Sequence, residues 1–120
     1  MADNAAVIRD FIAAWSRLDP SELAAFFAED GVYHNIPAAP VRGRQNIEAF
    51  IAGFIKPWSS THWDLLNLIV SGEIVVAERL DRSRVGEREI NLPCWGVFEM
   101  SAGKIKVWRD YFDMQTYVKA

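Results

Sequence analysis

The sequence predicts a single α+β domain, in which helices from the first half of the chain pack on one face of a curved, mixed but mainly antiparallel β-sheet. Two observations predict this class. Hydrophobic residues recur at helical spacing before Pro57 and alternate with a period of two after it. Turns that contain glycine then divide the second half into runs of strand length. The 120 residues are 51% hydrophobic and 24% charged, the balance of one folded domain spanning residues 1–120.

The first half is expected to form three helices and one short strand. The first helix carries a hydrophobic stripe from Val7 to Leu18. The second begins at Asp19, a capping residue, has Pro20 in its first turn, and is expected to end at Gly31 in a left-handed conformation. Its buried stripe consists of Leu23, Phe26 and Phe27. A strand over 32–36 follows, and the third helix is marked by Ile47, Phe50, Ile51 and Phe54.

The second half is expected to form four antiparallel strands over 62–70, 74–84, 88–100 and 104–112. Pro93 lacks a backbone N–H, so it indicates a bulge or an edge position in the third of these strands. Several strands are hydrophobic on both faces; Ile74 and Val76, for example, alternate with Val75 and Ala77. If the helices cover one face, the other face also needs a cover, and we therefore expect a homodimer.

Composition excludes several classes of function. The formal net charge is −3, which disfavours nucleic-acid binding. One cysteine, Cys94, allows no internal disulfide, and together with two histidines it excludes a structural Cys/His zinc site. The longest apolar stretch, 49–55, is too short to span a membrane. Because the N-terminus carries an acid and no cluster of basic residues, we expect no secretory leader and a cytoplasmic protein.

The informative residues are polar ones on strands whose neighbours are hydrophobic. Strand parity places Arg79 and Asp81 on one face with Val75 and Ala77. Asp110 shares a face with Trp108 and Phe112, and Tyr33 shares one with Asn35. Each residue alone has an ordinary explanation as a solvated strand face, a surface charge cluster, a core residue or a turn. Together, they predict polar groups that converge on one apolar cavity: Arg79, Asp81, Asp110, Tyr33 and Asn35.

An arginine between two buried aspartates has a chemical consequence. Each Arg–Asp contact near 4 Å is worth roughly 4 kcal/mol at an effective dielectric of about 20. Desolvating a second carboxylate costs several kcal/mol, so the pair is expected to keep one shared proton near neutral pH. That leaves one base and one acid, and spacing alone does not say which aspartate is which. With Tyr33 and Asn35 holding a water, such a set suits one-step hydrolysis of a strained ring ether, without metal or cofactor.

At these residues, the sequence resembles the limonene epoxide hydrolase family, part of the SnoaL-like and nuclear transport factor 2-like (NTF2-like) superfamily. The resemblance runs from the first helix to about Asp113. It is carried by Tyr-x-Asn at 33–35, Arg-x-Asp at 79–81 and Trp-Arg-Asp at 108–110. The family's fold, which is also called cystatin-like, implies a cone with a deep pocket. The family also implies no cofactor, a small apolar epoxide and water as substrates, and a dimer.

The resemblance also implies a role for each residue. Asp110 would be the base that activates water, and Tyr33 and Asn35 would hold that water. Asp81 would be the acid that protonates the epoxide oxygen, and Arg79 would bridge the two carboxylates. The expected substrate-binding wall consists of Trp15, Leu92, Cys94, Trp108 and Phe112, with Ser83 adding a polar group beyond Asp81. Because the chain ends soon after the last strand, a pocket more open than in longer relatives is expected.

Two other functions compete with epoxide hydrolysis. One is a proton-transfer isomerase of the ketosteroid isomerase type, which needs a neutral carboxylic acid to donate to an oxyanion. A fixed cation at Arg79 argues against it, because a neighbouring cation favours the ionised acid. The other is a non-catalytic cone that binds a small molecule, in which the polar groups only orient an apolar ligand. Against it stands the pair of carboxylates, which destabilises the protein without an evident gain in binding.

Overall fold

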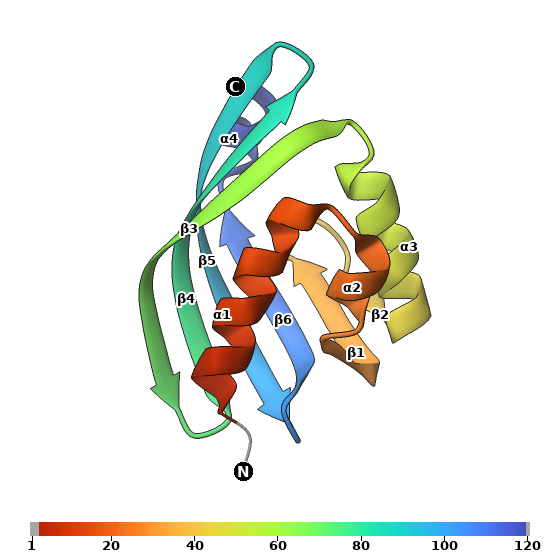
Figure 1. Cartoon of the computed structure of the whole chain (residues 1–120), viewed down its shortest axis with the longest axis vertical. Coiled ribbons are helices and arrows are strands. Elements are labelled where there is room, and N and C mark those ends of the chain that lie inside the picture. Colours follow the sequence, from red (N-terminus) through yellow and green to blue (C-terminus); the bar gives the residue numbers. More distant parts are fainter. Residues whose placement is uncertain (1–2, 120) are drawn as a thin grey trace.

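A computed structural model describes residues 3–119, and it confirms the α+β class. Six strands form one curved sheet in the order β2-β1-β6-β5-β4-β3, in which only the β1–β6 pair is parallel among the described pairs. The sheet curls around helix α1 (Asn4–Ala14), while α2 (Pro20–Ala24) and α3 (Arg44–Ile55) lie on the side of β1 and β2 (Figure 1). The helices and the sheet therefore enclose a space between them.

Helix α1 begins where the sequence supplies a cap. The Asp3 carboxylate accepts a hydrogen bond from the Ala6 N–H, and the buried stripe includes Ile8, Phe11 and Ile12. A short 3₁₀ turn, Trp15–Arg17, extends the helix, and Leu18 then adopts a left-handed conformation with φ of 50°. The Asp19 carboxylate caps α2, and Pro20 occupies its first turn, as predicted.

The predicted end of the second helix is wrong. Helix α2 ends at Ala24, and β1 (Phe27–Asn35) begins at Phe27, so Phe27 is a strand residue that pairs with Ile105. Gly31 lies within β1 and ends no helix. A Cβ at residue 31 would lie 3.0 Å from the Ala28 carbonyl oxygen and 3.2 Å from that of Ile105. Glycine is needed here because β1 changes register against β6 between Phe27 and Val32.

The remaining strands are β2 (Val41–Arg42), β3 (Trp58–Ser71), β4 (Ile74–Val85), β5 (Arg88–Ser101) and β6 (Lys104–Phe112). Of these strands, β2 was not predicted, β6 has the predicted bounds, and β3, β4 and β5 are longer than predicted. The last pairing of β5 with β6 is Cys94 with Phe112, while Pro93 still lies opposite Leu80 of β4. At Pro93, β5 therefore no longer pairs with β6 and its side toward β6 is a free edge. Of the two predicted alternatives for Pro93, a bulge or an edge position, the edge position is the one found. A short helix, α4 (Met114–Lys119), follows β6 and was not predicted.

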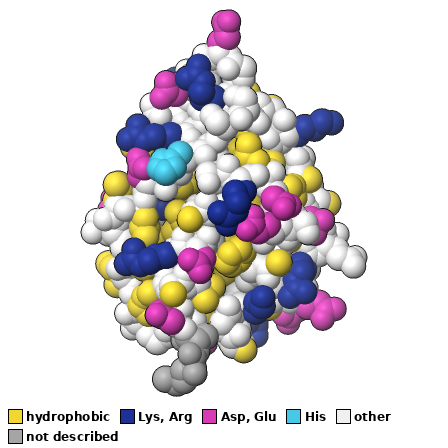
Figure 2. All heavy atoms as spheres, viewed as in Figure 1, with side chains coloured by type: hydrophobic (Ala, Val, Ile, Leu, Met, Phe, Trp, Pro, Cys, Tyr) yellow, Lys and Arg dark blue, Asp and Glu magenta, His cyan; other side chains and the backbone are white. Residues whose placement is uncertain are grey.

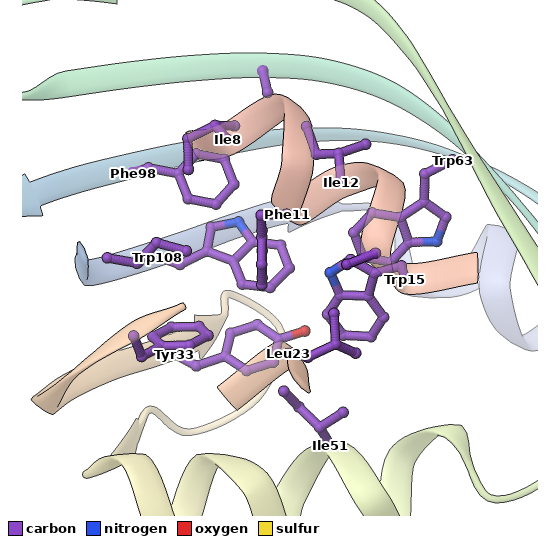
Figure 3. Close-up of a cluster of buried hydrophobic side chains, with 14 of the residues drawn as sticks. Ile8, Phe11, Ile12, Trp15, Leu23, Tyr33, Ile51, Trp63, Phe98 and Trp108 are labelled. Atoms are coloured by element: carbon purple, nitrogen blue, oxygen red, sulfur yellow. The ribbon is translucent and has the colours of Figure 1, made fainter. Parts of the chain in front are cut away.

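An aromatic cluster fills the space between the helices and the sheet (Figure 3). The Trp108 ring lies between Tyr33, at 4.4 Å between ring centroids, and Phe98, at 5.2 Å. Phe11 of α1 meets the Trp108 ring edge-on at 5.1 Å. Trp15 stacks on Trp63 of β3 at 4.3 Å. These side chains fix the helices against the sheet and form a rigid floor under the polar residues described below.

The surface has a mixed character. On the face that carries α1, positive and negative side chains are interspersed (Figure 2). Within residues 3–119, no helix has both the length and the apolar character that crossing a membrane requires.

Candidate active site

The register of four neighbouring strands brings the predicted polar residues together. The parallel pairing of β1 with β6 sets Tyr33 beside Trp108 and Asn35 beside Asp110. Gly96 of β5 lies opposite Asp110 on one side and opposite Ala77 of β4 on the other. Because Gly96 has no side chain, β4 can reach across β5 to β6 at this level.

Arg79 spans that gap and binds both aspartates. Its Nε and Nη2 donate to the two carboxylate oxygens of Asp81 at 3.0 and 2.8 Å. Its Nη1 and Nη2 donate to the two oxygens of Asp110 at 2.8 and 2.9 Å. Both contacts are bidentate, the strongest geometry an arginine offers to a carboxylate. The predicted Asp-Arg-Asp arrangement is therefore present in the structure.

The guanidinium of Arg79 is fully buried between charged and aromatic partners. It is 0% exposed, and its Cζ lies 4.4 Å from the centroid of the Trp63 ring. Burial works to lower the pKa of Arg79, but the charges of Asp110 and Asp81 outweigh it and hold that pKa well above its ordinary value. Arg79 is thus a fixed cation.

For Asp110, the effect of burial on the pKa is larger than the opposing effect of the Arg79 charge. Burial raises the pKa of Asp110 above its ordinary value, against the opposing pull of Arg79, and the charge of Asp81 adds to the rise. The indole Nε1 of Trp108 is buried without a hydrogen bond of normal geometry, although its proximity favours the charged form of Asp110. A carboxylate with a raised pKa is a stronger base, which bears on the chemistry below.

Tyr33 and Asn35 reach the same cavity from β1. They are 2% and 6% exposed, and both line the pocket beside Asp110. Burial raises the pKa of the Tyr33 hydroxyl well above its usual value, and the charge of Asp110 adds to the rise. The hydroxyl therefore stays protonated and is available as a donor or acceptor.

The pocket is narrow, and nearly half of the residues that line it are aromatic. The empty space between its walls and out to solvent is about 370 Å³. Only a small part of this space, room for about one water molecule, is wide enough to admit a water. Its apolar walls come from β3, β5, β6 and the two helices α3 and α4. The lining residues are Tyr33, Asn35, Phe54, Trp58, Trp63, Asp81, Ser83, Ile90, Leu92, Cys94, Asp110, Phe112 and Tyr117.

The structure distributes the predicted substrate wall over two layers. Leu92, Cys94 and Phe112 line the pocket, whereas Trp15 and Trp108 are 0% exposed and lie in the aromatic floor behind it. Sequence reasoning missed five lining residues from α3, β3, β5 and α4: Phe54, Trp58, Trp63, Ile90 and Tyr117. For Trp63 the alternation along β3 was an available signal, but that strand is irregular between Leu65 and Asn67, which obscures the parity.

Helix α4 contributes one residue, Tyr117, to the wall of the pocket. Trp58 Nε1 donates to the Tyr117 hydroxyl at 3.2 Å, and the Tyr117 ring stacks on Phe54 at 6.2 Å between centroids. Arg88 Nη2 donates to the Tyr117 carbonyl oxygen at 3.1 Å. The six-residue helix α4 therefore reaches the pocket through the side chain of Tyr117.

One cluster near the pocket has the donor types of a metal site. Asp81, Cys94 and Asp110 offer ligand atoms that lie within 4.8 Å of one another. Arg79 already bonds all four carboxylate oxygens, however, and the Cys94 Sγ donates to Asp81 Oδ2 at 3.3 Å. Burial raises the pKa of the Cys94 thiol far above its usual value, with Asp81 adding to the rise, so the thiolate a metal needs is disfavoured. The guanidinium occupies the place of a cation here.

The chain is similar to known proteins over nearly its whole length. The family model for the limonene-1,2-epoxide hydrolase catalytic domain matches residues 2–120. Epoxide hydrolase EphG of Mycobacterium tuberculosis (strain ATCC 25618 / H37Rv) is 26% identical over 112 residues, covering 93% of this chain and 74% of that protein.

Solved structures share the fold. An LEH-like epoxide hydrolase from M. tuberculosis superposes with a TM-score of 0.84 at 25% identity, covering 97% of this chain and 86% of that one. An NTF2-like protein of unknown function from Burkholderia pseudomallei K96243 superposes with a TM-score of 0.88 at 21% identity, covering 99% and 97%. The second likeness concerns the fold alone, and the expected NTF2-like architecture is confirmed.

Proposed function

Because the chain belongs to the limonene-1,2-epoxide hydrolase family, we propose that it is a cofactor-independent epoxide hydrolase that adds water to a neutral, mainly apolar epoxide. The observation that carries this proposal is the bidentate bridge of Arg79 between Asp81 and Asp110 at the wall of the pocket. Tyr33 and Asn35 line the same pocket as Asp81 and Asp110, so four polar residues face the space in which an epoxide would react.

In the proposed reaction, Asp110 removes a proton from a water held by Tyr33 and Asn35. The water oxygen attacks an epoxide carbon, the bond from that carbon to the ring oxygen breaks, and Asp81 gives its proton to that oxygen. The product is a vicinal diol, and one water has been consumed. The cycle closes when Asp110 returns its proton to Asp81 through water in the pocket. The raised pKa of Asp110 suits the base role, because a stronger base takes the water proton more readily.

Arg79 would hold both carboxyls in place while their shared proton moves. Buried carboxylates this close repel each other, and the guanidinium between them offsets that repulsion. A pocket that only binds a ligand would have no use for two carboxylates held against one arginine.

The experiment is diol formation from limonene, cyclohexene and styrene oxides, with and without a chelator, by the wild type and Asp110→Asn. We expect chelator-resistant turnover that falls by about 10²-fold or more in Asp110→Asn, the scale for losing a positioned base. Asp30→Asn, an exposed change on the same strand as Tyr33, is the matched control and should retain activity. Turnover near the wild-type level in Asp110→Asn would sink the proposed base, and no turnover of any epoxide would favour a binding function.

We further propose that two copies of the chain associate through the outer face of the sheet. Trp95 is 50% exposed and Tyr111 is 40% exposed, and these two residues pair across β5 and β6. Ile74 of β4 is a further exposed hydrophobic residue on the sheet, at 37%. Large side chains of this kind in one patch are typical of an interface.

A further inference from the structure

The pocket wall carries a hydroxyl group, that of Ser83, which the proposed hydrolysis does not use and which is hydrogen-bonded to a second buried hydroxyl, that of Thr61. Ser83 and Thr61 are 4% and 6% exposed, and their side-chain oxygens lie 2.8 Å apart. Thr61 Oγ1 accepts a hydrogen bond from Trp63 Nε1 at 3.0 Å and lies 3.2 Å from the Arg82 carbonyl oxygen. Ser83 itself lines the pocket, on the same face of β4 as Asp81. Polar groups are therefore buried in an otherwise apolar stretch of wall.

The protons of these two hydroxyls can be arranged in two ways. If Thr61 donates to the Arg82 carbonyl, Ser83 donates to Thr61 and its own oxygen keeps lone pairs for the pocket. If Thr61 donates to Ser83, the proton of Ser83 is left to donate into the pocket. Thr61 is the hydrogen-bond partner of Ser83 within residues 3–119, so in both arrangements Ser83 keeps one unfilled bond. Rotation of two hydroxyl hydrogens switches the pair from acceptor to donor.

The charge of the pocket restricts what Ser83 could bind. None of the described residues that line the pocket is lysine or arginine, while Asp81 and Asp110 are both among them. A carboxylate or phosphate on the substrate would find no free cation and would be repelled by the aspartates. A neutral group is needed, and a hydroxyl fits best because it both donates and accepts, as Ser83 does.

The strand geometry fixes where that group lies. Ser83 is two residues beyond Asp81, a step of about 6.7 Å along a strand. We infer that Ser83, oriented by Thr61, binds a hydroxyl group of the substrate, so that the natural substrates are neutral hydroxy-epoxides. Their hydroxyl oxygen lies about 5 to 7 Å from the epoxide oxygen that Asp81 protonates. This inference rests on the proposed epoxide hydrolysis and adds the substrate class.

The test compares three terminal epoxides of six carbons: 1,2-epoxyhexane, 5,6-epoxyhexan-1-ol with a distant hydroxyl, and 1,2-epoxyhexan-3-ol with an adjacent one. We expect kcat/KM for 5,6-epoxyhexan-1-ol to exceed that of each other compound by about fivefold, the effect of one neutral hydrogen bond. Equal values for the three compounds, or a preference for 1,2-epoxyhexane, would overturn the inference. This comparison uses the wild type, so it does not depend on how a variant folds.

Variants then assign the preference to Ser83. In Ser83→Ala, the ratio of kcat/KM between the distant-hydroxyl compound and 1,2-epoxyhexane should fall to about one. The matched control is Ser59→Ala, because Ser59 is an exposed residue of the same strand as Thr61 and donates to a β4 carbonyl, that of Arg84, at 3.3 Å. That variant should keep the wild-type ratio. A ratio that survives in Ser83→Ala would place the hydroxyl elsewhere and contradict the assignment.

A binding measurement separates this inference from the proposed function. Calorimetry compares hexane-1,2-diol with hexane-1,2,6-triol, the corresponding products, in wild type and Ser83→Ala. Tighter binding of the triol by the wild type alone, without turnover of any epoxide, would support the Ser83 site while sinking the hydrolase proposal. Turnover of epoxides with no preference for the triol, or with no binding of either product, would sink the Ser83 site alone.

Discussion

Arg79 is the residue on which the proposed site depends, because it is the ion-pair partner of two buried carboxyl groups at once. Replacing it with alanine leaves Asp81 and Asp110 buried without a counter-charge, a change that typically destabilises a protein by about 3–5 kcal/mol. The pKa of Asp110, which burial already raises above its ordinary value, should then rise further, because the opposing charge of Arg79 is gone. A carboxyl with a raised folded-state pKa destabilises the fold above that pKa, and this penalty disappears when the group is protonated in both states.

The first prediction is therefore a pH dependence. The loss in melting temperature of Arg79→Ala relative to wild type should be full near pH 8 and should shrink as the pH falls toward about 4. Thermal unfolding followed by circular dichroism at several pH values measures it. Arg82→Ala, which removes an exposed arginine that bonds Asp64 at 2.7 Å, is the matched control and should change stability by less than about 1 kcal/mol. A loss in Arg79→Ala that is the same at every pH would contradict the unpaired-charge explanation.

Gly96 supplies a second prediction at the same scale. A Cβ at residue 96 would lie 2.8 Å from Trp108 Nε1, 3.0 Å from Arg79 Nη1 and 3.1 Å from Asp110 Oδ1. Because the indole ring is packed in the aromatic floor, the β5 backbone must move away from it, and the arginine and the aspartate beside this stretch of β5 shift as well. Gly96→Ala should lower stability by about 1–3 kcal/mol and turnover by about 10²-fold, the effect of misplacing catalytic groups by 1 Å.

The control for Gly96→Ala is a substitution at a glycine where an added Cβ would meet no other atom. No heavy atom lies within 4 Å of a Cβ built on Gly53, which is in helix α3, so Gly53→Ala should leave turnover unchanged and stabilise the helix by about 0.5–1 kcal/mol. Turnover with purified variants and chemical unfolding measure the two effects. Full activity in Gly96→Ala would show that the triad tolerates displacement.

The five polar residues could be predicted from the sequence because each lies on a regular stretch of strand. Alternation along β4 and β6 gives the correct face for Arg79, Asp81 and Asp110. The roles of Gly96 and Thr61 could not be predicted, since both depend on which residues lie opposite across two strand pairs. Cross-strand register is a property of the folded sheet, and no local pattern reports it.

At the scale of elements, we expect helix α4 to limit what enters the pocket, because its Tyr117 is one of the lining residues. Tyr117 reaches from this helix to Trp58 and Phe54, which are the outer walls of the cavity. Replacing Tyr117 with alanine should widen the opening and raise kcat/KM for bulky epoxides, such as limonene oxide, relative to a small one, such as cyclohexene oxide. The ratio of the two specificity constants is the measurement, because it cancels differences in the amount of active protein.

Two further variants of α4 sharpen this prediction. Val118→Ala changes a neighbouring side chain that is 60% exposed and should leave the ratio unchanged. Tyr117→Phe keeps the ring on Phe54 and removes the acceptor of the Trp58 indole, so it separates the bulk of the ring from the hydrogen bond. An unchanged ratio in Tyr117→Ala would mean that the helix does not limit access.

The elements that sequence reasoning misplaced share a physical cause. Phe26 and Phe27 fit a helical stripe, but α2 ends at Ala24 because the pairing of Phe27 with Ile105 across the sheet prevails over local periodicity. The six residues of α4 have no buried side chain, so they lack the hydrophobic stripe that predicts a helix. Long strands with glycine turns were predicted well because their signals are local.

At the scale of the whole molecule, the last prediction concerns the proposed dimer through the outer face of the sheet. Trp95 and Tyr111 pair on this face, and an exposed tryptophan beside a tyrosine is a typical centre of an interface. Trp95→Lys would place a charge at that centre, and burying it unpaired is costly, so the variant should be monomeric at concentrations at which the wild type is a dimer. Sedimentation velocity measures the masses of the wild type and of the variant.

The control is Leu66→Lys, which changes an exposed residue of the edge strand β3. Strand β3 is separated from β6 by β4 and β5, so this variant should leave the mass unchanged. A monomeric wild type, or a dimer that persists in Trp95→Lys, would exclude this face as the interface. Because Gly96, whose missing side chain accommodates the triad, follows Trp95 directly on β5, a dimer formed there would also stiffen the strand that supports the site.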